Sequence, residues 1–202
     1  MNMKKIILLL SLFVCYFSFC SAQTAKQVLD KCAATLNTKE GLKADFSMTS
    51  AQYGSASGTI AIKGRMFHAT TSVAAMWFDG KTQWTYMKKT DEVSVTNPTE
   101  AQLQAINPYN FINMYKKGFK YTMTADDKTY KVHLTAENSS KRISEMFITI
   151  NKKSYEPSEV KLLQGKKWTT FTISNLKKVV MADSEFKFNS KDYPTAEVID
   201  LR

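Results

Sequence analysis

The feature that most constrains the fold is an alternation of apolar and polar side chains that recurs along the chain. It begins at residues 42–49 and returns in the segments 60–63, 66–71, 119–124, 129–136 and 146–150. Successive side chains of a β-strand point to opposite faces, so this period of two is typical of strands with one buried face. The connections between the segments are short, which favours antiparallel pairing. We therefore predict a mainly antiparallel β protein with helices (α+β), whose ten to eleven strands curl around one interior.

A helix is predicted before the first strand. Thr24 and Gln27 have the spacing of a capping box, in which each side chain accepts a hydrogen bond from the backbone N–H of the other residue. Apolar residues from Val28 to Leu36 then recur at helical spacing, and Gly41 is expected to end the helix. Cys32 lies on the apolar face, so we expect a small core residue rather than a reactive thiol.

A helical insertion is predicted midway along the chain, over residues 97–118, where the strand pattern stops. Asn107 suits an N-cap and Pro108 the first helical position, and Gly118 ends the segment. If the sheet closes only in part, this insertion must cover the opening. The side chains expected to form such a lid are Tyr109, Phe111, Ile112 and Met114.

Two further segments are predicted to reverse the chain. Residues 54–58 are rich in Ser and Gly and are expected to form a turn. Asp79-Gly80 can supply the positive φ angles of a tight two-residue hairpin. The strands of this hairpin are expected to carry four large side chains on one apolar face: Met76, Phe78, Trp84 and Tyr86.

Residues 1–22 are interpreted as a signal peptide. Lys4 and Lys5 precede the apolar run Ile6–Phe19, which is short for a membrane span, and small residues lead to a cleavage site after Ala22. The alternative is a membrane-anchored lipoprotein with Cys20 as its lipidated residue. Removal of this segment leaves residues 23–202 as a single domain, and the loss of two lysines lowers the formal net charge from +10 to +8.

Residues in catalytic or metal-binding patterns are scarce. His68 and His133 are isolated from each other and from cysteine, and both are expected to face solvent. The sequence has neither a nucleophile elbow nor a phosphate-binding glycine loop. The carboxylate pair Asp126-Asp127 is interpreted as a turn. We therefore predict that the protein is not an enzyme and uses no metal or cofactor.

Lysines occur in pairs at expected turns and strand ends: Lys88-Lys89, Lys116-Lys117, Lys152-Lys153, Lys166-Lys167 and Lys177-Lys178. Such pairs can protect sheet edges and keep a protein soluble. They can also attract anionic lipid head groups or an acidic partner. We expect a monomer that does not bind nucleic acid, because the sequence lacks a motif that reads RNA or DNA.

The apolar side chains of the strands face one interior, which is either filled as a core or open to a ligand. A barrel of about eight or more strands has room for a ligand. Methionine and aromatic side chains are adaptable and suit a flexible apolar one. The residues expected to line this interior are Phe46, Met48, Ile60, Ile62, Phe67, Trp84, Tyr86, Phe171 and Ile173.

Four motifs follow one another in a characteristic order: Leu42-Lys43-Ala44-Asp45-Phe46-Ser47-Met48, Gly58-Thr59-Ile60-Ala61-Ile62-Lys63 with Arg65-Met66-Phe67, Asp79-Gly80-Lys81-Thr82-Gln83-Trp84-Thr85-Tyr86, and Phe186-Lys187-Phe188. In order and spacing they resemble the periplasmic outer-membrane lipoprotein carrier proteins, the LolA family, and their wider lipoprotein-binding superfamily. The resemblance spans nearly all of residues 23–202. It implies an unclosed half-barrel whose helices form a lid.

The same resemblance implies a periplasmic carrier that binds the acyl chains of lipoproteins, or lipids, and shuttles them toward the outer membrane. It implies loading by an inner-membrane lipoprotein-release complex and delivery to an outer-membrane acceptor. In the family, an arginine after the second strand latches the lid, and Arg65 is the matching residue here. The alternative on the same fold is a lipid- or lipoprotein-sensing scaffold that signals to a protein partner.

Overall fold

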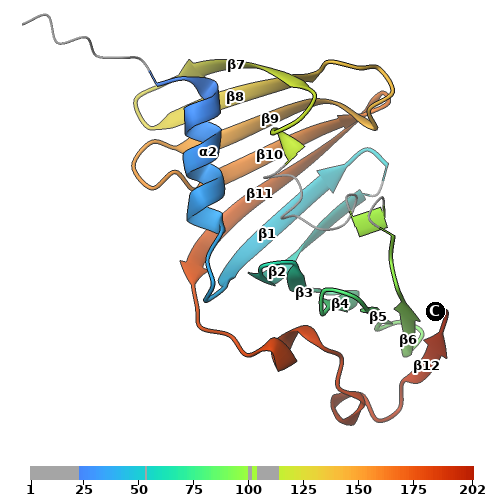
Figure 1. Cartoon of the computed structure of the whole chain (residues 1–202). Helices are drawn as coiled ribbons and strands as arrows, with labels where there is room; N and C mark the ends of the chain where they lie inside the picture. Colours follow the sequence, from blue (N-terminus) through green and yellow to red (C-terminus); the bar gives the residue numbers. More distant parts are fainter. Residues whose placement is uncertain (1–22, 53, 100–101, 104–113) are drawn as a thin grey trace, which may run out of the picture.

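A computed structural model describes residues 23–52, 54–99, 102–103 and 114–202, and its main element is one large sheet (Figure 1). The strands are β1 (Leu42–Ser50), β2 (Gly54–Lys63), β3 (Met66–Thr71), β4 (Ala74–Phe78), β5 (Gln83–Met87), β6 (Glu92–Thr96), β7 (Phe119–Ala125), β8 (Thr129–Ala136), β9 (Ile143–Asn151), β10 (Pro157–Gln164), β11 (Lys167–Lys178) and β12 (Glu197–Asp200). They form a 12-stranded sheet in the order β12-β6-β5-β4-β3-β2-β1-β11-β10-β9-β8-β7. Its edge strands, β7 and β12, lie far apart, so the sheet is open. The predicted unclosed half-barrel is confirmed, with twelve strands rather than ten to eleven.

Strands β1 and β11 join the two halves of this sheet. From β1, the chain adds β2 to β6 in sequence on one side, whereas β10 to β7 lie beyond β11 on the other. Phe46 of β1 is opposite Ile173 of β11, and Met48 is opposite Phe171. Pairing between neighbours is antiparallel except for β12, which runs parallel to β6. Residues from the two ends of the sequence therefore meet in the middle of the sheet.

The helix α2 (Ala25–Leu36) covers the concave face of one half of the sheet, across β7 to β10 (Figure 1). Its capping box is confirmed, because Gln27 N donates to Thr24 Oγ1 at 3.2 Å and Thr24 N donates to Gln27 Oε1 at 2.9 Å. Four residues of its apolar face are buried against the strands: Val28, Leu29, Cys32 and Leu36. Burial raises the pKa of the Cys32 thiol to about 12, in keeping with the predicted core position. Within the described residues, no helix has the length and apolar character to cross a membrane.

The end of α2 differs from the prediction. The helix ends at Leu36 with Asn37 as its C-cap, and Gly41 instead directly precedes the first strand. Gly41 has a φ of +122°, and a Cβ added there would lie 2.3 Å from Met181 Cε. The glycine is therefore required by its backbone conformation at the start of β1 and not by the helix end, since the flexible end of the Met181 side chain could move away.

The C-terminal segment covers the convex face of the other half of the sheet. After β11 it forms two short 3-10 helices, η1 (Asp183–Phe186) and η2 (Ser190–Asp192), before β12. Phe186 is buried against Ala61 of β2, and Lys63 Nζ donates to the backbone oxygen of Met181 at 2.8 Å. The helix α2 therefore covers the concave face of one half of the sheet. The C-terminal segment covers the convex face of the other half.

The predicted turn over residues 54–58 is wrong, since these residues begin β2 and the chain reverses between Ser50 and Gly54. Gly58 lies opposite Phe46 and Ala56 lies opposite Met48. A Cβ on Gly58 would lie 1.8 Å from the backbone oxygen of Thr70 in β3. These small residues allow close strand approach and leave space beside large side chains, which in this segment outweighs their preference for turns.

The hairpin between β4 and β5 is confirmed, but its loop contains the four residues Asp79 to Thr82 rather than two. Asp79 Oδ1 accepts hydrogen bonds from Lys81 N at 3.0 Å and Thr82 N at 2.8 Å. A loop with an even number of residues pairs even positions of one strand with odd positions of the other, here Trp77 with Trp84. Directly paired residues share a face, so the expectation of one face with Met76, Phe78, Trp84 and Tyr86 is wrong.

Candidate functional site

An apolar cavity of about 370 Å³ lies on the concave face, beside the part of the sheet that α2 covers. Its walls come from α2, β1 to β4, β10 and β11. The lining residues are Leu36, Leu42, Ala44, Phe46, Met48, Ala56, Ile60, Ile62, Phe67, Ala69, Thr71, Ala74, Ala75, Met76, Pro157, Val160, Phe171, Ile173 and Leu176. Thr71 is the one polar residue among these, and none carries a charge. This lining can exclude water from an apolar ligand but offers no acid, base or nucleophile for catalysis.

The structure brings together the predicted lining residues from β1, β2, β3 and β11. Phe46, Met48, Ile60, Ile62, Phe67, Phe171 and Ile173 all line the cavity. Trp84 and Tyr86 lie outside it, on the convex face with Trp77. Tyr86 contacts Tyr193 of the C-terminal segment, with ring centroids 4.6 Å apart, and its hydroxyl donates to Asp91. These contacts give Tyr86 a packing role.

Sequence reasoning missed several lining residues that continue the alternation already recognised. Leu42 and Ala44 precede Phe46 at a spacing of two, and Val160 lies at an apolar position of β10. The small residues Ala56 and Ala69 were missed for a different reason. Ala56 leaves space opposite Met48, and Ala69 leaves space opposite Met76. These pairs are known only once the register of the strands is known.

Leu103 lies over the concave surface near the far side of the cavity. Its side chain is only 3% exposed and packs with Phe67 and Phe78, whose ring centroids are 5.5 Å apart. Leu103 belongs to the predicted insertion over residues 97–118. At least this part of the insertion therefore contacts the face that also forms the cavity.

The other end of the insertion is anchored to α2. Tyr115 is buried, and its hydroxyl donates to Asp30 Oδ1 at 2.6 Å. Burial and the hydrogen bond to Asp30 both raise the pKa of Tyr115, with burial the larger cause. Tyr121 of β7 donates to the backbone oxygen of Tyr115 at 2.6 Å. The chain thus leaves the insertion at a position fixed against both the helix and the sheet.

The predicted lid residues are only partly within the described chain. Met114 is half-buried and packs against the core beneath α2, whereas Tyr109, Phe111 and Ile112 lie outside the described residues. Arg65 is exposed in the turn between β2 and β3, next to Gly64 with its φ of +57°. Its role as a latch stays a prediction.

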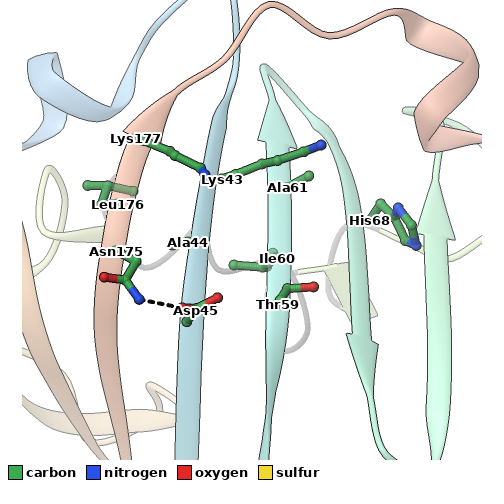
Figure 2. Close-up of a pocket in the computed structure, with 10 residues that line it drawn as sticks. All are labelled: Lys43, Ala44, Asp45, Thr59, Ile60, Ala61, His68, Asn175, Leu176 and Lys177. Carbon is green, nitrogen blue, oxygen red and sulfur yellow. Dashed lines mark hydrogen bonds between the residues drawn. The ribbon is translucent and has the colours of Figure 1, made fainter.

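A second cavity, of about 640 Å³, lies on the convex face of β11, β1, β2 and β3 (Figure 2). It is lined by Lys43, Ala44, Asp45, Thr59, Ile60, Ala61, His68, Asn175, Leu176 and Lys177. Three of these, Ala44, Ile60 and Leu176, also line the apolar cavity, so the sheet itself separates the two. The second cavity therefore carries the polar side chains of the strands that line the first.

The two histidines have different surroundings. His68 is half-buried and stacks on Trp77 with ring centroids 5.0 Å apart, so the prediction that it faces solvent is wrong. Burial lowers the pKa of His68, and the charge of Lys43 lowers it further. His133 lies on the convex face, where its Nε2 is 2.9 Å from Glu145 Oε2. Neither histidine lies in a group of three or more His, Cys, Asp or Glu residues that could hold a metal, as far as the described chain extends.

Comparison with known proteins identifies the family. No curated protein matches the sequence. The fold is similar to an uncharacterised conserved protein from Thermus thermophilus, with a TM-score of 0.59 and 15% identity over 88% of this chain and 99% of that one. A LolA superfamily protein from Nitrosomonas europaea matches with a TM-score of 0.44 and 11% identity over 82% of this chain and 98% of that one. Residues 16–166 match the family described as outer membrane lipoprotein carrier protein LolA. Since this match covers well over half of the sequence, the chain belongs to the LolA family.

Proposed function

We propose that this protein is a periplasmic carrier that binds the acyl chains of lipoproteins in the concave cavity and shuttles them toward the outer membrane. The observation that carries the proposal is the composition of that cavity, which lies on an open sheet and has no charged residue among the described residues that line it. Its volume of about 370 Å³ falls within the range of roughly 300–1,000 Å³ that is usual for ligand sites. Membership of the LolA family is consistent with binding and carrying rather than with catalysis.

A carrier must bind its cargo well and still release it. Burial of a methylene group contributes about 0.8 kcal/mol, so a sixteen-carbon chain could gain about 13 kcal/mol at most. An opposing cost keeps the net affinity moderate. Displacement of the insertion, which already buries Leu103 against Phe67 and Phe78, would supply such a cost. In this proposal the lid competes with the cargo for the same apolar surface.

Membership of the LolA family also supports the proposed partners and location. An inner-membrane lipoprotein-release complex would load the carrier, and an outer-membrane acceptor would take the cargo from it. Both steps would occur in the periplasm, in agreement with the signal peptide predicted over residues 1–22.

Organic extraction of the purified protein, followed by mass spectrometry, tests the proposal. We expect acyl or diacyl species to be recovered, and a fluorescent acyl probe to compete with them for one site. An Ile173→Asp variant places a charge in the cavity and should lose the probe, whereas Thr172→Asp, its neighbour on the opposite face, should retain it. Recovery of no lipid together with no probe binding would reject the carrier and favour a scaffold that binds protein partners.

A further inference from the structure

We propose that the polar cavity on the convex face binds a phosphate ester. This site is separate from the acyl cavity and does not depend on the proposed carrier function. Its residues come from four neighbouring strands: Lys43 and Asp45 from β1, Thr59 from β2, His68 from β3, and Asn175 and Lys177 from β11. Figure 2 shows these side chains around one hollow on the same side of the sheet.

An irregularity in the sheet shapes this cavity. Lys43 pairs with Lys177 and Asp45 pairs with Ser174, so β11 contains one more residue than β1 between these pairs. Asn175 lies in this bulge with a φ of +52°, a left-handed conformation that is uncommon outside glycine and that asparagine adopts more readily than most residues. Its Nδ2 donates to Asp45 Oδ2 at 2.6 Å (Figure 2). Bulges of this kind redirect side chains and are common beside functional sites.

The lysines supply the main argument for an anion. Lys43 and Lys177 are directly opposite one another in the ladder, and Figure 2 shows both along one rim of the cavity. Like charges directly opposite one another destabilise a sheet. Lys43 has a carboxylate of Glu185 at 3.4 Å, while no ion pair of Lys177 is found in the described parts of the chain. A ligand with two or more negative charges would relieve this repulsion.

The opposite wall adds a second, independent feature. His68 Nε2 is buried and has no hydrogen-bond partner among the described residues. Buried polar atoms in proteins nearly always have a hydrogen-bond partner, and a functional role is one explanation for an exception. Burial is the main cause that lowers the pKa of His68; the charge of Lys43 lowers it further and that of Glu185 raises it.

The remaining polar groups indicate an ester rather than free phosphate. The Asp45 carboxylate and the Thr59 hydroxyl can accept hydrogen bonds from a hydroxyl or amino group of a ligand. A cavity of about 640 Å³ is also far larger than one phosphate requires. A phosphate that carries a small hydroxylated or amino group fits both the charges and the acceptors. This chemistry occurs in soluble phosphate esters and in phospholipid head groups.

Isothermal titration of the full mature chain at low ionic strength tests the proposal. The probes are sn-glycerol 3-phosphate, inorganic phosphate, uncharged glycerol, and vesicles of phosphatidylglycerol or phosphatidylcholine. We expect the ester to bind more tightly than inorganic phosphate, and glycerol not to bind. Lys177→Gln and Lys43→Gln should each weaken ester binding about tenfold, because a charge-assisted hydrogen bond is lost. Lys128→Gln, in the exposed turn between β7 and β8, is the matched control.

The arms of the experiment separate the sources of the ligand. Binding of the free ester identifies a soluble compound as the ligand. Binding of phosphatidylglycerol vesicles alone identifies a lipid head group. Either result supports a phosphate site if Lys177→Gln weakens the binding. Absence of binding to every phosphate probe would overturn the proposal. The proposal would also be overturned if Lys128→Gln weakened ester binding as much as Lys177→Gln and Lys43→Gln do, because the overall charge of the protein would then explain the attraction. Near-UV circular dichroism checks that each variant is folded, and acyl-probe binding should be unchanged in all three.

Discussion

Filling the concave cavity from one wall should weaken acyl binding without unfolding the protein. Ala56 of β2 lines this cavity opposite Met48 and is half-buried. Ala56→Leu adds about three methylene equivalents to a space that an acyl chain would otherwise occupy. At about 0.8 kcal/mol for each displaced methylene, the loss is about 2.4 kcal/mol, or about fiftyfold in Kd. The new side chain contacts apolar neighbours, so the free energy of unfolding should stay unchanged or rise.

Fluorescence titration with an acyl probe measures this effect, and urea unfolding measures stability in parallel. Ala125→Leu is the matched control, because Ala125 is exposed at the end of β7 and lies outside the cavity. The control should bind the probe as the wild type does. Unchanged probe affinity in a stable Ala56→Leu protein would refute the reasoning, since it would place the acyl chain elsewhere.

Three further predictions concern stability and are measured by urea unfolding. Gly58→Ala should destabilise the protein by about 3 kcal/mol, because its Cβ would overlap the backbone of Thr70, and a loss below about 0.5 kcal/mol would contradict the close approach of β2 and β3. Tyr115→Phe should cost about 1 kcal/mol through loss of the hydrogen bond to Asp30, and an Asp30→Asn background should reduce this cost. The pKa of His68 is lowered in the folded state, so the unfolded state binds more protons and stability should fall as the pH drops below about 6.5. His68→Phe should flatten that fall, and an identical pH profile in the variant would show that His68 does not contribute.

The strands and most cavity residues could be predicted because one physical cause produces both. A strand with one buried face must alternate, and the residues on that face then converge wherever the sheet curves. Phe46, Ile60 and Phe171 therefore follow from the pattern without knowledge of the pairing. The capping box at Thr24 was equally local, since both of its hydrogen bonds lie within three residues.

The errors arose where the answer depends on segments distant in sequence. Trp84 and Tyr86 looked suitable for the cavity, but an even loop length places them on the convex face, where the C-terminal segment contacts Tyr86. Gly58 looked like a turn residue, although the proximity of Thr70 explains why it lacks a side chain. The convex cavity was not predicted because it depends on the bulge at Asn175, which appears only when β1 and β11 are paired.

The length of α2 explains why a cavity exists at all. The helix has 12 residues and a rise of about 1.5 Å per residue, so it is about 18 Å long. Strands lie about 4.8 Å apart, so a helix that crosses them can cover about four strands. Figure 1 shows α2 over β7 to β10, and its last residue, Leu36, already lines the cavity. The apolar concave faces of β11 and β1 to β4 extend beyond the helix, and in the proposed carrier cycle the insertion or a ligand would cover them. A longer helix would fill the hollow with its own side chains, so the short helix is what leaves this surface available to the proposed cargo.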